Sequence, residues 1–232
     1  MSAAISTRLL SLRVGRVQPF GPIGQPSAIG KQPVSGRIEV RKLGLAGDEQ
    51  ADSRHHGGID KALHHYPYEH YAAWARELPA QAALFEAGGF GENLSTLGLV
   101  ENTVCLGDVF QIGSAMVQVS QGRKPCWKLN HRFGIADMAR RVQDSGRTGW
   151  YYRVLAEGNI APDDELSLIE RPHPDWTLAR LIKVLYHDKP DRKALAALAE
   201  LTILAPSWRE MAEKRLTTGR IESWLRRLGT DG

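Results

Sequence analysis

The stretch LGDVFQIGSAMVQVS, residues 106–120, holds two short β-branched and apolar runs that meet at the tripeptide Ile112-Gly113-Ser114. Two such runs joined by a glycine-bearing turn are typical of a β-hairpin. Similar runs recur from residue 5 to about residue 170, namely SLRVGRVQPF (11–20), VSGRIEVRKLGL (34–45), NTVCLGDVFQIG (102–113), AMVQVSQ (115–121), WYYRVLAEG (150–158) and ELSLIERP (165–172). Many short strands with few helices predict a mainly β, α+β fold built on a barrel-like domain.

Two helical patterns interrupt the strands, YEHYAAWARELP (68–79) and ADMARRVQDSG (136–146). The first places Tyr68, Tyr71 and Ala75 at helical spacing, and the second ends at a glycine suited to a C-cap.

The sequence pattern changes from strand-like to helix-like after IERPHPDW, where Pro172 and Pro174 interrupt regular structure. Three helix-periodic segments follow, WTLARLIKVLYHD (176–188), RKALAALAEL (192–201) and SWREMAEKRLTTGRIESWLRRL (207–228), separated by Pro190 and Pro206. Asp175 is the expected cap of the first helix. We therefore divide the chain into a β domain, residues 1–171, and a small three-helix extension, residues 172–232, which is too small for a generous core of its own and should pack on the barrel.

Composition places the chain among soluble globular proteins, with 42% hydrophobic and 24% charged residues in 232. Arg8, Arg13 and Arg16 interrupt any secretory signal, and no run approaches the length that spans a bilayer. The two cysteines, Cys105 and Cys126, form no framework of the secreted disulfide kind, so we expect a cytoplasmic protein. The net charge of +4 comes without a basic run interleaved with aromatics, which argues against binding to a nucleic acid polymer.

Cys126 follows directly on Arg123, Lys124 and Pro125 in QGRKPCWKL (121–129). Neighbouring cations favour the thiolate, which is the form that attacks electrophiles and binds metals. A lone cysteine is more often buried filler, but this one follows a predicted strand, where side chains can face a cleft. Cys105 stands between apolar residues of a strand and is assigned to the core.

Five of the eight histidines lie in GLAGDEQADSRHHGGIDKALHHYPYEH, residues 44–70. Its centre is HHGG (55–58), where two glycines permit positive φ and close approach of the backbone to a ligand. Three interpretations stay open: contacts to an anionic cofactor, which we favour, structural histidines, and a His-only metal site, for which the HExxH spacing is absent. A structural role is favoured for the acids of this region, Asp48, Asp52 and Asp60.

A glycine-rich loop, GGFGENLSTLGL (88–99), presents Glu92 and Asn93. It is neither a P-loop nor a dinucleotide fingerprint, because no GK[ST] follows and the glycine spacing is wrong. A plain turn without a functional role is the alternative to a ligand-binding loop, and we weight the two about equally.

Taken together and in this order, GDEQADSRHHGGIDKALHHYP (47–67), FGENLS (90–95), LGDVF (106–110) and VSQGRKPCWKL (119–129) resemble the MOSC domain, and most closely its small YiiM-type members. The resemblance spans nearly the whole chain, with the MOSC part over roughly residues 15–170 and a three-helix extension after it. It implies a barrel-like domain that binds molybdopterin. In related reductases the cysteine that Cys126 matches ligates molybdenum, and in other members it is a persulfide carrier.

The same resemblance implies reduction of N-hydroxylated nucleobases such as 6-hydroxylaminopurine, from R–NHOH to R–NH2 and water, with the molybdenum cofactor. Such a reaction needs a proton donor, for which His56 or His55 are candidates, while Asn93 would hold substrate or cofactor. Cys126, His56 and Asn93 are the expected catalytic residues, and Cys126 is the expected metal ligand. The expected cofactor-binding residues are His55, His56, Gly57, Gly58, Asn93, Arg123, Lys124 and Cys126.

Electrons must come from a separate reductase, expected to be a flavoprotein, because the chain has too few cysteines for a four-Cys iron–sulfur cluster and no flavin or nicotinamide fingerprint. The C-terminal helices are a candidate docking surface, or else they cover a barrel face or a homodimer interface. Two rival functions remain: a cofactor or persulfide carrier, and a nucleic-acid or nucleobase binding module.

Overall fold

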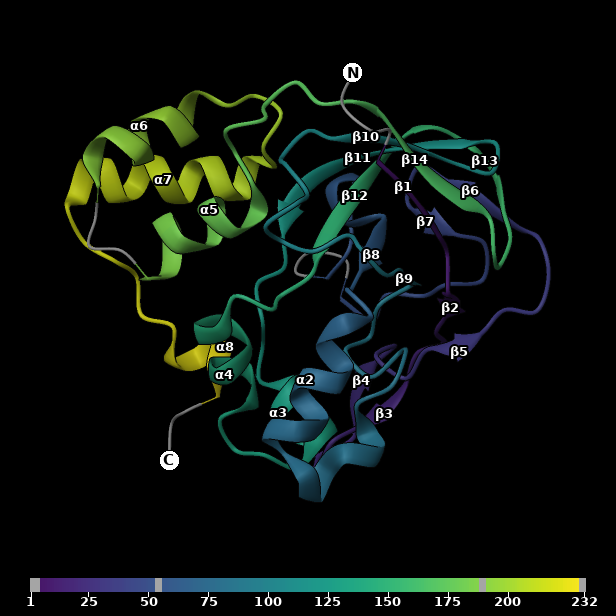
Figure 1. Ribbon diagram of the computed structural model, residues 1–232. Helices are drawn as coiled ribbons and strands as arrows, with labels where there is room; N and C mark the ends of the chain where they lie inside the picture. Colours follow the sequence, from purple (N-terminus) through teal and green to yellow (C-terminus); the bar gives the residue numbers. More distant parts are fainter. Residues whose placement is uncertain (1–4, 53–55, 188–190, 230–232) are drawn as a thin grey trace.

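The computed structural model describes residues 5–52, 56–187 and 191–229. Its largest element is a curled sheet of nine strands that forms a half-barrel (Figure 1). In spatial order the strands are β1 (Ser6–Arg8), β14 (Glu165–Glu170), β10 (Val109–Ile112), β11 (Ala115–Gly122), β12 (Trp150–Ala156), β8 (Leu63–His65), β9 (Leu94–Ser95), β2 (Ser11–Val14) and β5 (Gln32–Pro33). Neighbouring strands are antiparallel except β8 and β9, which pair in parallel at His65 and Leu94.

The predicted hairpin is confirmed, since β10 and β11 pair from Val109 opposite Gln118 to Ile112 opposite Ala115. That register leaves Gly113 and Ser114 as a two-residue turn. Gly113 has φ +51, and an added Cβ would lie 2.4 Å from the Asn159 carbonyl oxygen. Only glycine therefore fits this turn without displacing the neighbouring backbone.

Two smaller sheets flank the large one: β13 (Gly158–Ile160), β6 (Ile38–Arg41) and β7 (Gly44–Leu45) form one, and β3 (Gln18–Phe20) and β4 (Gln25–Ser27) form the other. Short 3-10 turns cover Ile59–Lys61 and Pro79–Leu84. The predicted mainly β, barrel-like class is thus confirmed.

Three helices gather below the sheet in Figure 1, namely α2 (Glu69–Glu77), α3 (Lys128–Phe133) and α4 (Met138–Ser145). The C-cap of α4 is Gly146 in the left-handed conformation, as expected from the sequence. The buried face of α2 differs from the expected one, because Tyr71 and Trp74 are buried while Tyr68 is 42% exposed.

The C-terminal region is helical, as predicted, with α5 (Leu178–Ile182), a π-helical turn (Lys183–His187), α6 (Arg192–Glu200), α7 (Pro206–Thr218) and α8 (Leu225–Leu228). Thr177 caps α5 through its side chain, which accepts from the Arg180 amide, so the assignment of that cap to Asp175 is wrong. The last predicted helix is in fact two, because Gly219 ends α7 in the left-handed conformation.

Strands and C-terminal helices bury their apolar side chains in one cluster, which includes Phe110 and Val119 of the sheet together with Leu181, Leu198 and Trp208 of the extension. A second cluster, rich in aromatic rings, lies around α2, α3 and α4. The extension therefore packs on the barrel, whereas the boundary at residues 171 and 172 stays a prediction.

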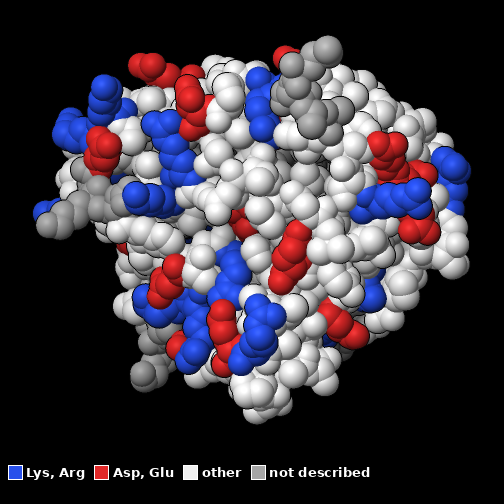
Figure 2. All heavy atoms as spheres, viewed as in Figure 1, with Lys and Arg blue, Asp and Glu red and all other residues white. Residues whose placement is uncertain are grey.

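Charged side chains are mixed on the face shown in Figure 2, where Lys and Arg are interleaved with Asp and Glu. The described atoms of this face form no basic stripe of the kind that follows a nucleic acid backbone. Within the described ranges, no helix is long and apolar enough to cross a membrane.

Candidate functional site

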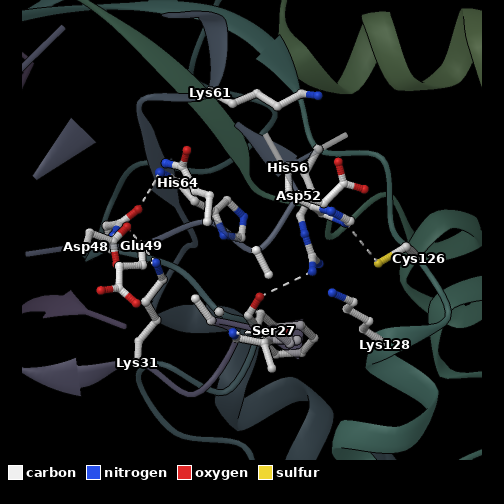
Figure 3. A pocket seen from close by; sticks show the side chains of 18 of the residues that line it. Ser27, Lys31, Asp48, Glu49, Asp52, His56, Lys61, His64, Cys126 and Lys128 are labelled. Atoms are coloured by element: carbon white, nitrogen blue, oxygen red, sulfur yellow. Dashed lines mark hydrogen bonds and ion pairs between the residues drawn. The ribbon is translucent and has the colours of Figure 1, made fainter. Parts of the chain in front are cut away.

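The stretches around residues 56, 93 and 126, which the sequence singles out, converge on one cleft with about 630 Å³ of free space, part of it open to solvent (Figure 3). Figure 3 shows Lys31, Asp48 and Glu49 on one side of the cleft and His56, Cys126 and Lys128 on the opposite side. The lining residues are Ser27, Ala28, Ile29, Lys31, Asp48, Glu49, Gln50, Ala51, Asp52, His56, Lys61, His64, Phe90, Gly91, Asn93, Arg123, Cys126, Lys128 and Tyr151.

Cys126 lies between the end of β11 and the start of α3, as the sequence suggests. Its thiol is half-buried and lines the cleft. The Sγ atom lies 3.7 Å from Nε2 of His56, within reach of a sulfur hydrogen bond. Cys105 is buried, as predicted, and its thiol donates to the Pro174 carbonyl.

His56 is held as a neutral imidazole at neutral pH. Burial lowers its pKa to about 4, and the nearby cations of Lys128 and Arg123 act in the same direction. Its Nδ1 atom is buried and has no hydrogen-bond partner among the described residues. His55, the other candidate proton donor, lies outside the described residues.

Arg123 is a buried cation that lines the cleft with 6% of its surface exposed. One guanidinium nitrogen donates to the Phe90 carbonyl at 3.2 Å, and Nη1 has no partner among the described groups. A buried guanidinium donor without an acceptor is costly unless a ligand supplies one.

Lys124 does not line this cleft, although the sequence places it with the cofactor. Its ammonium lies 5.1 Å from the ring centroid of Trp208 in the extension, and burial lowers its pKa to about 8. The side chains of these two neighbours therefore diverge beyond the end of β11: Arg123 lines the cleft, whereas Lys124 packs against the extension.

Asn93 lines the cleft but is fully engaged by the protein. Its Oδ1 accepts from the His64 amide, and its Nδ2 donates to the Arg13 carbonyl and to Asp48. Asp48 also pairs with the buried Lys31 at 2.6 Å. Asn93 therefore joins three segments of the cleft wall, and a direct contact to substrate or cofactor stays a prediction.

Neither Gly57 nor Gly58 is part of the cleft lining, whereas Asp52, for which a structural role was expected, does line it. Gly58 has φ +96, a conformation that favours glycine. Glu92 is buried and accepts from the Tyr71 hydroxyl and the Phe90 amide. Asp60 pairs with Arg153 at 2.7 Å, in line with the structural role expected for it.

Family comparisons agree with this geometry. The family model of the MOSC domain matches residues 52–167, and that of the YiiM-like 3-alpha helix domain matches residues 176–219. Protein YiiM of Escherichia coli is 46% identical over 214 residues, which is 92% of this chain and 95% of that protein. This chain belongs to the YiiM-like MOSC family.

Solved structures of YiiM proteins share the fold. The crystal structure of YiiM from Escherichia coli has a TM-score of 0.79 at 41% identity, covering 92% of this chain and 98% of that one. That of YiiM from Geobacillus stearothermophilus has a TM-score of 0.77 at 36% identity, covering 90% and 99%. A protein of Gibberella moniliformis named "Reductase" is 38% identical over 90% of this chain, which matches 37% of that longer protein.

The cleft of this YiiM-like chain suits an anionic, sulfur-rich group such as the molybdenum cofactor. Arg123, Lys61 and Lys128 supply positive charge, and the Cys126 thiol is a soft metal ligand. Nε2 of His64, like Nδ1 of His56 and Nη1 of Arg123, is buried without a partner among the described groups. Over the described ranges, no set of three His, Cys, Asp or Glu could hold a metal ion alone, so a metal bound at Cys126 would take further ligands from its cofactor.

The lining residues that sequence reasoning missed include four with side chains suited to binding: Lys61, His64, Lys128 and Tyr151. Lys61 and Lys128 lie within the motifs that carry the resemblance, and their positive charges could have indicated a role in binding an anionic group. His64 and Tyr151 stack at 4.8 Å because β8 and β12 are neighbours, which no local pattern reveals.

Proposed function

We propose that this protein binds the molybdenum cofactor in the cleft and reduces N-hydroxylated compounds with electrons from a separate reductase. Nucleobases such as 6-hydroxylaminopurine are the proposed substrates. The balanced reaction is R–NHOH + 2 e⁻ + 2 H⁺ → R–NH2 + H2O. The observation that carries the proposal is the half-buried Cys126 thiol in a cleft whose wall holds a buried guanidinium with an unpartnered nitrogen. Membership of the MOSC family and the relative named "Reductase" support it.

The cofactor, when bound, supplies a two-electron redox centre. Cys126 would provide a sulfur ligand for its metal, since thiolates suit soft metal sites. Arg123, Lys61 and Lys128 would neutralise its negative charge, and Arg123 gains the acceptor that it lacks within the protein. Lys31 is engaged with Asp48 and contributes less positive charge to the cleft.

His56 would relay protons rather than store them, because its imidazole is neutral at neutral pH. A neutral imidazole accepts a proton at one ring nitrogen and releases one from the other. The Nε2 atom faces Cys126, whereas Nδ1 is unpartnered among the described residues. Replacing His56 with Ala should therefore lower turnover at saturating reductant, measured per molybdenum bound. Unchanged turnover would remove His56 from the proton path.

The experiment that tests the proposal is molybdenum and pterin content after expression in a cofactor-competent host. Cys126→Ala should lose most of the molybdenum that the wild type carries. Cys105→Ala is the matched control, because that thiol is buried in the core away from the cleft, and it should keep the metal. No molybdenum in any of the three proteins would refute the proposed function. A mass increase of one sulfur atom on Cys126 would instead favour a persulfide carrier.

A further inference from the structure

The chain after α7 returns to the loop that carries Cys126. In Figure 1 this last segment, with α8, lies beside α4 and away from α6 and α7. It falls outside both matched family regions, which end at residues 167 and 219. The family matches therefore do not describe this segment, and its role is argued from its own contacts.

Arg227 of α8 bonds to both residues that flank Cys126. Its Nη1 donates to the Pro125 carbonyl at 2.6 Å, and its own carbonyl accepts from the Trp127 amide at 2.8 Å. One turn further into α3, the Asn130 side chain donates to the Leu228 carbonyl at 2.8 Å. The C-terminal segment thus holds the cysteine loop from both sides.

Arg227 is itself fixed in place. Its Nη2 donates to Oε1 of the buried Gln143 of α4, and its guanidinium lies 5.5 Å from the ring centroid of Tyr186. Gly229 follows with φ +69, and a Cβ there would approach Cβ of Trp127 to 2.6 Å. The Gly229 backbone therefore lies directly against the start of the Trp127 side chain, and glycine is required for that approach.

Within its own stretch of chain, Cys126 is held by its carbonyl, which accepts from the Leu129 amide of α3 at 3.0 Å, so the residues before it depend on bonds to other segments. Pro125 has no amide hydrogen to donate, and the Arg123 amide, which donates to Gly149, is the nearest anchor on the strand side. A reactive group must be held closely in place to act, and its supporting contacts set that geometry.

We propose that Arg227 is a positioning residue for Cys126, and that the end of the helical extension serves to hold this thiol toward the cleft. The inference rests on the proposed function only in taking Cys126 as the reactive thiol. It assigns to the C-terminal segment a role at the site beyond covering a face of the barrel.

The test compares Arg227→Ala and Arg227→Lys with Arg226→Ala, all as cofactor-free full-length protein. Arg226 is the matched control, since it is an exposed arginine on the same short helix. Two readouts follow the loop: hydrogen exchange of peptides covering residues 121–129, and the alkylation rate of Cys126 at a pH high enough to ionise the thiol in every variant, resolved from Cys105 by peptide mass spectrometry. Loss of the guanidinium bonds should accelerate both by about tenfold in Arg227→Ala, because 1.4 kcal/mol of hydrogen bonding corresponds to that factor. Arg227→Lys should restore part of the protection, since one ammonium can reach the Pro125 carbonyl or Gln143 but not both.

Equal exchange and alkylation in Arg227→Ala and Arg226→Ala would overturn the inference. So would acceleration that extends equally to the β10–β11 hairpin, residues 109–122, because that pattern reports a general loss of stability. If Arg227→Ala does not fold, Arg227→Lys and Arg227→Gln decide by the same criteria. These measurements need no cofactor, so their failure is separate from a failure of the molybdenum assay on Cys126→Ala.

Discussion

Arg123 is expected to lower the stability of the cofactor-free protein, because one of its donors is left for the proposed cofactor. Its guanidinium is buried, lies at hydrogen-bond distance from Phe90, and has an unpartnered nitrogen. Removing a buried unsatisfied donor relieves a desolvation penalty of about 1–3 kcal/mol. Arg123→Met should therefore raise the free energy of unfolding of the cofactor-free protein while its molybdenum content falls. Urea unfolding and metal analysis of one variant check both, and a destabilised Arg123→Met that keeps molybdenum would contradict the assignment.

His65 predicts acid sensitivity that is independent of the cleft. It is fully buried between the Tyr152 and Thr96 hydroxyls, and burial lowers its pKa to about 3. In the unfolded chain this histidine has an ordinary pKa near 6.5, so below that pH it is protonated in the unfolded state but not in the folded state. The free energy of unfolding therefore falls as the pH drops from about 6.5 toward 3. The slope is about 1.4 kcal/mol per pH unit for one group.

The measurement is urea unfolding at pH 7 and pH 5 for wild type and His65→Gln. The wild type should lose about 2 kcal/mol more than the variant over this interval. Identical losses would mean that His65 is not the titrating group. His56 and His64, whose pKa values burial also lowers, make a residual slope in the variant expected.

Residue types and order made a few of the cleft's lining residues predictable, but side-chain direction did not follow from them. Cys126, His56 and Arg123 meet at the cleft as the motifs predicted. Lys124 lies near the Trp208 ring instead, because the irregular chain after β11 turns its side chain toward the extension. Direction depends on where β11 sits in the sheet, which the sequence does not state.

At the scale of elements, strands and helices were predictable where a local period decides them. The β10–β11 hairpin and the C-cap of α4 follow from alternation and from glycine. The break between α7 and α8 was missed because the periodic pattern continues past Gly219, and glycine within a helical pattern does not always end it.

The requirement for glycine at Gly113 in the hairpin turn can be tested by substitution. Gly113→Ala meets both a left-handed backbone and the Asn159 carbonyl at 2.4 Å, whereas at Gly134, with φ +64, an added Cβ meets nothing within 4 Å. Gly134→Ala should cost about 1 kcal/mol from the backbone conformation alone. Gly113→Ala should cost about 1–3 kcal/mol more, from the clash. Chemical denaturation of the two variants checks the difference, and equal costs would show that the turn relaxes freely.

For the whole molecule, the order of strands was beyond reach because pairing joins distant segments. β1 lies beside β14, and β8 lies between β12 and β9. The convergence of residues 27–31, 48–52 and 123–128 at one cleft follows from that order and not from any local pattern. The family resemblance grouped these motifs into one site, which no local periodicity could do.

The shared core predicts that barrel and extension unfold together, despite the boundary that the sequence suggests at residues 171 and 172. Leu195 of α6 is 1% exposed and belongs to the same buried cluster as Phe110 of β10. Leu195→Ala should therefore cost about 2–5 kcal/mol and shift both parts equally. Hydrogen exchange along a urea series, followed in peptides 109–122 and 206–218, should show one common midpoint in wild type and one common, lower midpoint in the variant. Protection lost first in residues 206–218, with the hairpin unchanged, would mean that the extension is an independent unit and that its apolar contacts add little to the barrel. A common midpoint would mean instead that α7, from which the segment holding Cys126 continues, is as stable as the sheet, which is a condition for a C-terminal helix to keep a reactive thiol in place.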